Sequence, residues 1–229
     1  MGDLYDAIFV RRSVRQYEPE PLSAQELEQI KAVLDEAPQL PGQSARFVFA
    51  DAGELKGVAA PHAVLAYSSG DDAAMCNIGY TLQTLDLWLQ GNGYGSLWMG
   101  MGKPLDKSAD YRVLLAFGRS SVPLRKSVGE FKRKAVLEIS NEDNAVANTA
   151  RLAPSAMNFQ PWKMHFDDGK LLCRLSPNGI FKLLPLKLQS IDLGIFLKTT
   201  VLALEHEGKS IDEITLRDGK SFAVGIKYS

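Results

Sequence analysis

Two stretches that repeat each other, NIGYTLQTLDLWLQGNG at 77–93 and DLGIFLKTTVLALEHEG at 192–208, decide the fold. Each has the length and apolar spacing of a long helix, and each closes on a glycine, the residue that commonly follows a helix C-terminus. Aligned without gaps, with residue 77 against residue 192, they are offset by 115 positions. Their identical positions are Gly79/Gly194, Leu82/Leu197, Thr84/Thr199, Leu87/Leu202, Leu89/Leu204 and Gly93/Gly208.

A second pair of segments aligns at nearly the same offset. EAPQLPGQSARFVFAD at 36–51 matches LAPSAMNFQPWKMHFD at 152–167 when residue 36 is set against residue 152, an offset of 116. Two matches at nearly one offset predict an internal duplication, with one half at 1–131 and a shorter half at 132–229. The alternative is that any two amphipathic helix–strand units resemble each other this closely.

The remaining elements are expected around these repeats. Ser23 and Glu26 form the pattern of a capping box, so a helix is predicted to begin at Ser23. Alternation of helices and apolar strands predicts an α+β fold, a mixed sheet with covering helices, in two homologous halves that form a pseudo-dimer within one chain. Further helices are expected at 3–11 and 73–90, and strands at 46–50, 63–68, 96–100, 112–117 and 221–228.

Composition limits the possible partners. The chain has 229 residues, of which 45% are hydrophobic, and a formal net charge of −1, so no overall basic field favours a nucleic acid or an anionic membrane. No apolar run approaches the ~20 residues of a membrane-spanning helix. The 2 cysteines and 3 histidines lack disulfide or metal-ligand spacing, so we expect no metal site and a cytoplasmic protein.

The first candidate binding motif is RRSVR at 11–15. In an extended segment Arg11, Ser13 and Arg15 would point to one face, where two guanidiniums and a hydroxyl could hold a phosphate. Arg12 would point away or contribute through its backbone. The alternative is a solvated helix end whose arginines complement the helix dipole.

The second and third motifs are a polar turn and a glycine-rich strand. APSAMNFQPW at 153–162 offers short polar groups suited to a polyhydroxyl chain or a ring edge, although a plain connection rich in turn formers is the alternative. In GNGYGSLWMG at 91–100, glycines would let a planar ligand approach the backbone, and an amide of Gly100 or Met101 could meet a ring nitrogen. No dinucleotide fingerprint or P-loop is present.

Together these motifs resemble the nitroreductase family. RRSVRQY, GYGSLWMG, Arg125 and the turn APSAMNFQPW fall in that family's order. The resemblance implies an FMN held by Arg11, Ser13 and Arg15, with Arg125 completing the phosphate site and Gly100 and Met101 near the flavin N5. It also implies that the turn residues Pro154, Ser155, Ala156 and Asn158 reach the same flavin from the other half.

The two halves retain different motifs. The first keeps the arginines and the glycine-rich strand, but Gln39 and Gly42 replace Ser155 and Asn158 in its turn; the second keeps only the turn. We therefore expect one complete FMN site in a monomer that imitates the family's dimer. The expected activity is transfer of a hydride from NAD(P)H, through the flavin, to a nitroaromatic, quinone or similar acceptor. The alternatives are a flavin-binding protein without turnover, a flavin-dependent dehalogenase or flavin-degrading enzyme, and a degenerate structural homologue that binds no flavin.

Overall fold

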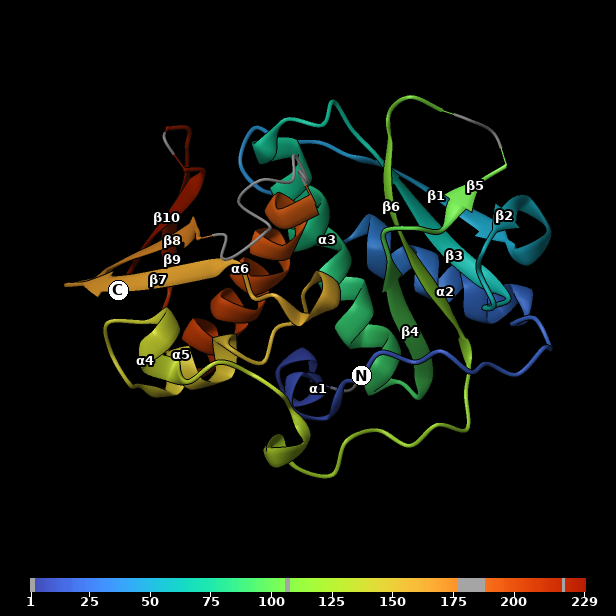
Figure 1. Cartoon of the computed structure of the whole chain (residues 1–229), viewed down its shortest axis with the longest axis horizontal. Coiled ribbons are helices and arrows are strands. Elements are labelled where there is room, and N and C mark those ends of the chain that lie inside the picture. Colours follow the sequence, from blue (N-terminus) through green and yellow to red (C-terminus); the bar gives the residue numbers. More distant parts are fainter. Residues whose placement is uncertain (1–2, 106–107, 177–187, 220) are drawn as a thin grey trace.

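The computed structural model describes residues 3–105, 108–176, 188–219 and 221–229 (Figure 1). Its first part contains α1 (Leu4–Val10), α2 (Ala24–Asp35), β1 (Arg46–Asp51), η1 (Ala52–Glu54), β2 (Leu55–Lys56), β3 (His62–Tyr67), α3 (Asp72–Gly91), β4 (Tyr94–Met99), β5 (Lys103–Pro104) and β6 (Tyr111–Arg119). Its second part contains η2 (Val128–Glu130), α4 (Val136–Ile139), α5 (Ala145–Ala150), η3 (Ala156–Asn158), β7 (Trp162–Asp167), β8 (Lys170–Leu175), α6 (Leu188–His206), β9 (Ile211–Arg217) and β10 (Ala223–Tyr228).

Two four-stranded sheets lie at opposite ends of the molecule, with α3 and α6 between them (Figure 1). Their strand orders are β1-β3-β6-β4 and β7-β8-β10-β9. In each sheet the chain runs through two strands, a long helix and two more strands, and the last strand lies between the second and the third. The α+β class is confirmed.

The expected mixed sheet is wrong. Every strand pair described in the two four-stranded sheets is antiparallel. The helix α3 does connect two strands that run the same way, β3 and β4, but β6 lies between them and pairs antiparallel with both. The second half also contains β8 and β9, which the sequence patterns did not predict.

Helices α3 and α6 pack backbone against backbone at two glycines. A Cβ atom placed on Gly79 would overlap the carbonyl oxygen of Ile191, and one placed on Gly194 would overlap the carbonyl oxygen of Cys76. The contact is reciprocal, because each glycine meets the residue that precedes the other glycine by three positions in the facing helix. Only glycine permits this approach.

The hydrophobic core forms where these helices meet the inner faces of both sheets. Trp162 of β7 stacks on Phe196 of α6 with ring centroids 4.8 Å apart. Phe47 packs against this core from β1, as do Trp162 and Met164 from β7. The ungapped match of 36–51 on 152–167 aligns Phe47 with Lys163, and this is wrong for the strand. Phe47 corresponds to Trp162 instead, so the two strands align at an offset of 115 and not 116.

The predicted start of α2 is confirmed. Ser23 accepts a hydrogen bond from the Glu26 amide, and the Glu26 carboxylate accepts one from the Ser23 amide at 2.8 Å. Within the described ranges, no helix combines the length and the apolar character needed to cross a membrane.

The glycine contact leads to a first prediction. Gly79→Ala should lower the free energy of unfolding by about 1–3 kcal/mol or more, because the added methyl group forces the two helix backbones apart. Gly91→Ala is the matched control, since its Cβ would meet only the Ala7 side chain at 3.5 Å, an ordinary contact. Urea unfolding measures both; a Gly79→Ala protein as stable as the Gly91→Ala protein would contradict the close approach.

Candidate functional site

The segment RRSVR is fixed to α3 and β4 by a buried polar network. Arg11 follows the last turn of α1 and is 2% exposed, and its Nε lies 3.0 Å from a carboxylate oxygen of Asp86. The contact is an ion pair rather than an aligned hydrogen bond. Asp86 also accepts a 2.5 Å hydrogen bond from Ser96, and Gln90 accepts one of 2.7 Å from the Arg12 amide. The network therefore holds the segment at both its first and its second residue.

The side chains of this segment do not all lie as the alternation predicted. Arg11 is buried, Ser13 is partly buried and Arg15 is exposed. Arg12 does not point away from the cluster: its guanidinium donates to the Pro123 carbonyl at 2.6 Å and helps to lower the pKa of Arg125. The physical reason is that Asp86 attracts the Arg11 side chain inward, so the regular strand geometry assumed from the sequence does not apply.

Positive charge is concentrated around this segment. Arg125 donates to the Arg11 carbonyl, and its guanidinium lies 4.2 Å from the centre of the Phe131 ring. Arg133 approaches the same ring at 5.3 Å. Burial, followed by the charges of Arg11, Arg125 and Arg151, lowers the pKa of Arg133 to about 9. These guanidiniums repel one another, and a bound anion would relieve that repulsion.

The turn predicted from APSAMNFQPW is η3 with its flanking residues, and its backbone is strained. Met157, Asn158 and Gln160 have φ angles of 48°, 61° and 51°, in the left-handed region that favours glycine. Such residues persist where the surroundings hold them, commonly at functional sites. Here Ser155 Oγ accepts from the Gln160 amide at 2.9 Å, and Asp192 Oδ1 accepts from the Ala156 amide at 2.9 Å.

Arg133 connects the turn to the arginine cluster. Its Nη1 donates to Asn158 Oδ1 at 2.6 Å, while Asn158 Nδ2 donates to the Lys132 carbonyl at 2.7 Å. The structure thus brings Asn158 close to the cluster of Arg11 and Arg125, although both arginines are distant from Asn158 along the chain. Both polar atoms of the Asn158 side-chain amide have protein partners. Through the bond to Oδ1, Asn158 helps to position the guanidinium of Arg133.

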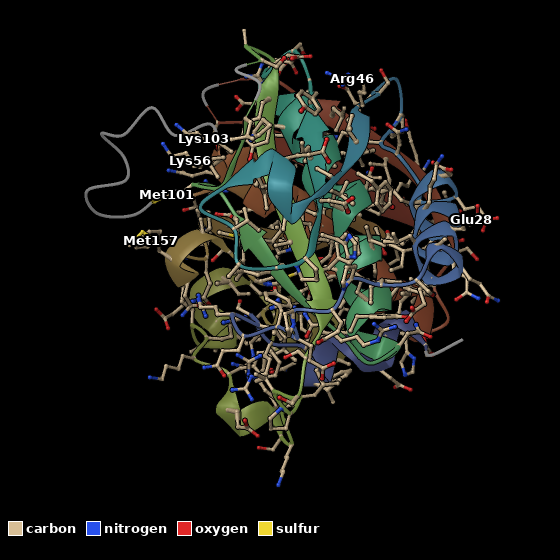
Figure 2. All side chains as sticks on the ribbon, turned by 90° about the vertical axis from the view of Figure 1, so that its right-hand side faces the viewer. Glu28, Arg46, Lys56, Met101, Lys103 and Met157 are labelled. Carbon is tan, nitrogen blue, oxygen red and sulfur yellow. The ribbon has the colours of Figure 1, made fainter. Side chains whose placement is uncertain are left out.

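The end of β4 and the turn meet at the start of α6. A Cβ atom on Gly100 would lie 3.3 Å from the side chain of Leu188, and Asp192, one helical turn further on, binds Ala156. Beside these positions, Met101 and Met157 are 91% and 81% exposed. Figure 2 shows both methionines along the same edge of the molecule. An exposed apolar pair of this kind suits contact with the flat face of a planar ring.

Several residues of this site were not predicted. Asp86, Arg133 and Asp192 acquire their roles through tertiary contacts that no local pattern contains. Asp192 alone had a usable signal, since it aligns with Asn77, and Asn77 Oδ1 accepts from the Leu40 amide at 2.7 Å as Asp192 accepts from Ala156. Burial raises the pKa of Asp192 to about 7.

One further cavity lies away from these residues. A cavity of about 410 Å³ lies on the outer face of the second sheet and is lined by mixed charges, among them Lys170, Glu213 and Arg217, with none of the residues above. In the part of the chain that the structure describes, no three histidine, cysteine or carboxylate side chains gather as metal ligands.

Comparisons with known proteins concern the family and the fold of the chain. A protein-family model described as "Putative TM nitroreductase" matches residues 3–204. A solved Thermotoga maritima structure of similar description has a TM-score of 0.73 and 18% identity, over 98% of this chain and 93% of its own. This likeness establishes the fold. No curated protein matches the chain.

Two further solved structures are more distant. A nitroreductase family protein from Clostridium difficile has a TM-score of 0.49 and 19% identity, over 63% of this chain and 100% of its own. A Desulfovibrio desulfuricans protein, described as a nitroreductase in complex with FMN, has a TM-score of 0.45 and 17% identity, over 62% of this chain and 96% of its own.

The buried ion pair leads to a second prediction. Arg11→Met should destabilise the cofactor-free protein by about 3–5 kcal/mol, because it leaves the Asp86 carboxylate buried without its partner. Arg15→Gln, at the exposed end of the same segment, should change stability by no more than about 0.5 kcal/mol. Unfolding in urea without added ligand distinguishes them, and equal stabilities would show that Asp86 does not depend on Arg11.

The raised pKa of Asp192 leads to a third prediction. The folded protein holds this proton up to about pH 7, whereas an unfolded aspartate releases it near the ordinary aspartate pKa of 3.8. The stability that Asp192 contributes is therefore complete below about pH 4 and is lost as the pH rises through 7. Urea unfolding at pH 4.5 and pH 8 measures the loss as the difference in the free energy of unfolding between the two pH values. This difference should be smaller in Asp192→Asn than in the parent protein, and an equal difference in the two proteins would contradict the prediction.

Proposed function

The chain belongs to the nitroreductase family whose pattern matches residues 3–204, and from that premise we propose that it is an FMN-dependent oxidoreductase. It would transfer a hydride from NAD(P)H to a nitroaromatic, quinone or similar small acceptor. The observation that carries the proposal is the connection, through Arg133, between the arginine cluster and the strained turn at Asn158. A basic cluster and a polar turn at one place suit the phosphate and the ring system of one FMN.

The donor set fits a flavin mononucleotide. Arg11, Arg12, Arg125, Arg133 and Arg151 lie near one another, and burial, followed by the charges of neighbouring arginines, already lowers the pKa of Arg125 and of Arg133. One terminal nitrogen of Arg11 is buried without a hydrogen-bond partner among the described residues. A phosphate dianion would satisfy such donors through charge-assisted hydrogen bonds.

We assign the proposed contacts by region. The cofactor phosphate and its chain would lie at Arg11, Arg12, Ser13, Arg15 and Arg125. The ring would lie between Gly100 and Met101 on one side and the turn of Pro154, Ser155, Ala156 and Asn158 on the other. Bound FMN supplies the hydride chemistry; the protein orients it, and its positive charge would favour the reduced, anionic ring.

We further propose that one chain acts as a pseudo-dimer. The two sheets share one strand order, the glycine contact between α3 and α6 is reciprocal, and Leu40–Asn77 repeats as Ala156–Asp192. These features support a duplication with halves at 1–131 and 132–229, a monomer, and one FMN per chain. A cytoplasmic location is part of the same proposal.

The activity itself is tested directly. The purified protein should carry the absorbance of bound FMN and should oxidise NADH or NADPH when a nitroaromatic or a quinone is present. Bound FMN without such oxidation would support a flavin-binding protein without turnover. Absence of FMN binding would overturn the proposal.

The phosphate site leads to a fourth prediction. Arg125→Gln should weaken FMN binding by about 1.5–3 kcal/mol, the range for a hydrogen bond to a charged group, which is roughly a 10- to 150-fold rise in Kd. Arg174→Gln is the matched control, because Arg174 is an exposed arginine on β8 of the second sheet. FMN fluorescence quenching gives both constants, and equal Kd values would remove Arg125 from the site.

A further inference from the structure

We infer that Asp192 is the positioning residue of the flavin-side turn, where its carboxylate holds the Ala156 amide and so sets the conformation of residues 155–158. The inference rests on the proposed function, since it concerns the same turn. Asp192 lies on α6, and its hydrogen bond to the turn is to the backbone of Ala156, so it is assigned a positioning role and not a catalytic one.

The turn requires such an anchor because its own backbone is strained. Three non-glycine residues between positions 157 and 160 have positive φ angles. Each such residue costs of order 1–3 kcal/mol unless its side chain tolerates the region, as asparagine does. Asp192 is 4% exposed, and its hydrogen bond to Ala156 measures 2.9 Å. Ala156 immediately precedes the strained residues. Its hydrogen bond to a buried acceptor on a helix therefore opposes relaxation of the turn to an unstrained backbone conformation.

The other half of the chain provides a natural comparison. Asn77 Oδ1 accepts from the Leu40 amide at 2.7 Å, and Asn77 Nδ2 donates to Gln39 Oε1 at 3.0 Å. There, an amide supports a turn that lacks the serine and the asparagine of the second copy. An acid occupies the equivalent position only beside the turn that retains them, although an amide would avoid the cost of burying a charge.

The charge of Asp192 should therefore matter to the turn. On the helices that pack against α6, the ionisable side chains are Asp72, Cys76, Tyr80 and Asp86 of α3 and Tyr5 and Asp6 of α1, whereas α5 and η3 contain none. Besides Asp192, α6 itself carries Lys198, Glu205 and His206. The strands packed against α6 add Lys170, Cys173 and Arg174 of β8 and Asp212, Glu213 and Arg217 of β9. Burial alone raises the pKa of Asp192, and the Ala156 amide opposes it. The ionised carboxylate is the stronger acceptor, so the anchor should tighten as the pH rises through about 7.

The anchor is tested first without cofactor. In the apo protein, the Ala156 amide nitrogen and proton shifts should titrate with a midpoint near pH 7, and Asp192→Asn should abolish that titration. Asn77→Asp, the same exchange of acid and amide at the equivalent position, should leave the Ala156 titration unchanged. A flat Ala156 response in the parent protein, or a titration that persists in Asp192→Asn, would overturn the inference.

The consequence for the cofactor is then measured by FMN titration at pH 6 and pH 8. Ionisation of the FMN phosphate changes affinity in every variant, so the informative quantity is the difference between proteins. The parent should gain several-fold more affinity than Asp192→Asn over this range, and Asn77→Asp should behave like the parent. Equal gains in the parent and in Asp192→Asn would overturn the role in cofactor binding. Failure of the parent to bind FMN at either pH would instead overturn the proposed function, a result that the Ala156 titration does not depend on.

Discussion

Helices α3 and α6 approach so closely at Gly79 and Gly194 that no side chain fits between their backbones. This contact determines the relative position of the two halves, because each helix carries one sheet on its outer side (Figure 1). It also places the first turns of α6 beside the end of β4, where Leu188 approaches Gly100 and Asp192 holds Ala156. A wider helix separation would move the turn away from the first half.

The site that results contains two kinds of arginine. Arg11 is neutralised by Asp86 and fixes the segment that carries it, whereas Arg125 and Arg133 stack on Phe131 at the edge of the cluster, where burial and neighbouring charges disfavour their ionised forms. Arg133 transmits the position of this cluster to the turn through Asn158. Arg11 thus has a structural role, whereas Arg125 and Arg133 are available for binding, and the sequence alone does not distinguish the two roles.

Sequence patterns predicted the parts of the fold that local physics determines. The glycines of the repeated helices, the capping box at Ser23 and the polar turn before β7 were all found in the structure. The order of strands was not predictable, because pairing of β6 between β3 and β4 depends on contacts across the chain. Asp86 and Arg133 were missed for the same reason: Arg11, the ionic partner of Asp86, is distant along the chain, and Leu152 and Asn158, which accept from Arg133, lie 19 and 25 residues away. The ungapped alignment of β1 on β7 failed because one residue of difference turns every side chain of a strand to the opposite face.

The central claim is that one chain supplies both sides of one flavin site. Native mass spectrometry of the FMN-loaded protein, sprayed from a volatile buffer at low micromolar concentration, tests it most directly. The account predicts one dominant species with the mass of a single chain and one FMN. A species of two chains with two FMN, which separates into chains without cofactor on mild activation, would place each site between two molecules and contradict the claim.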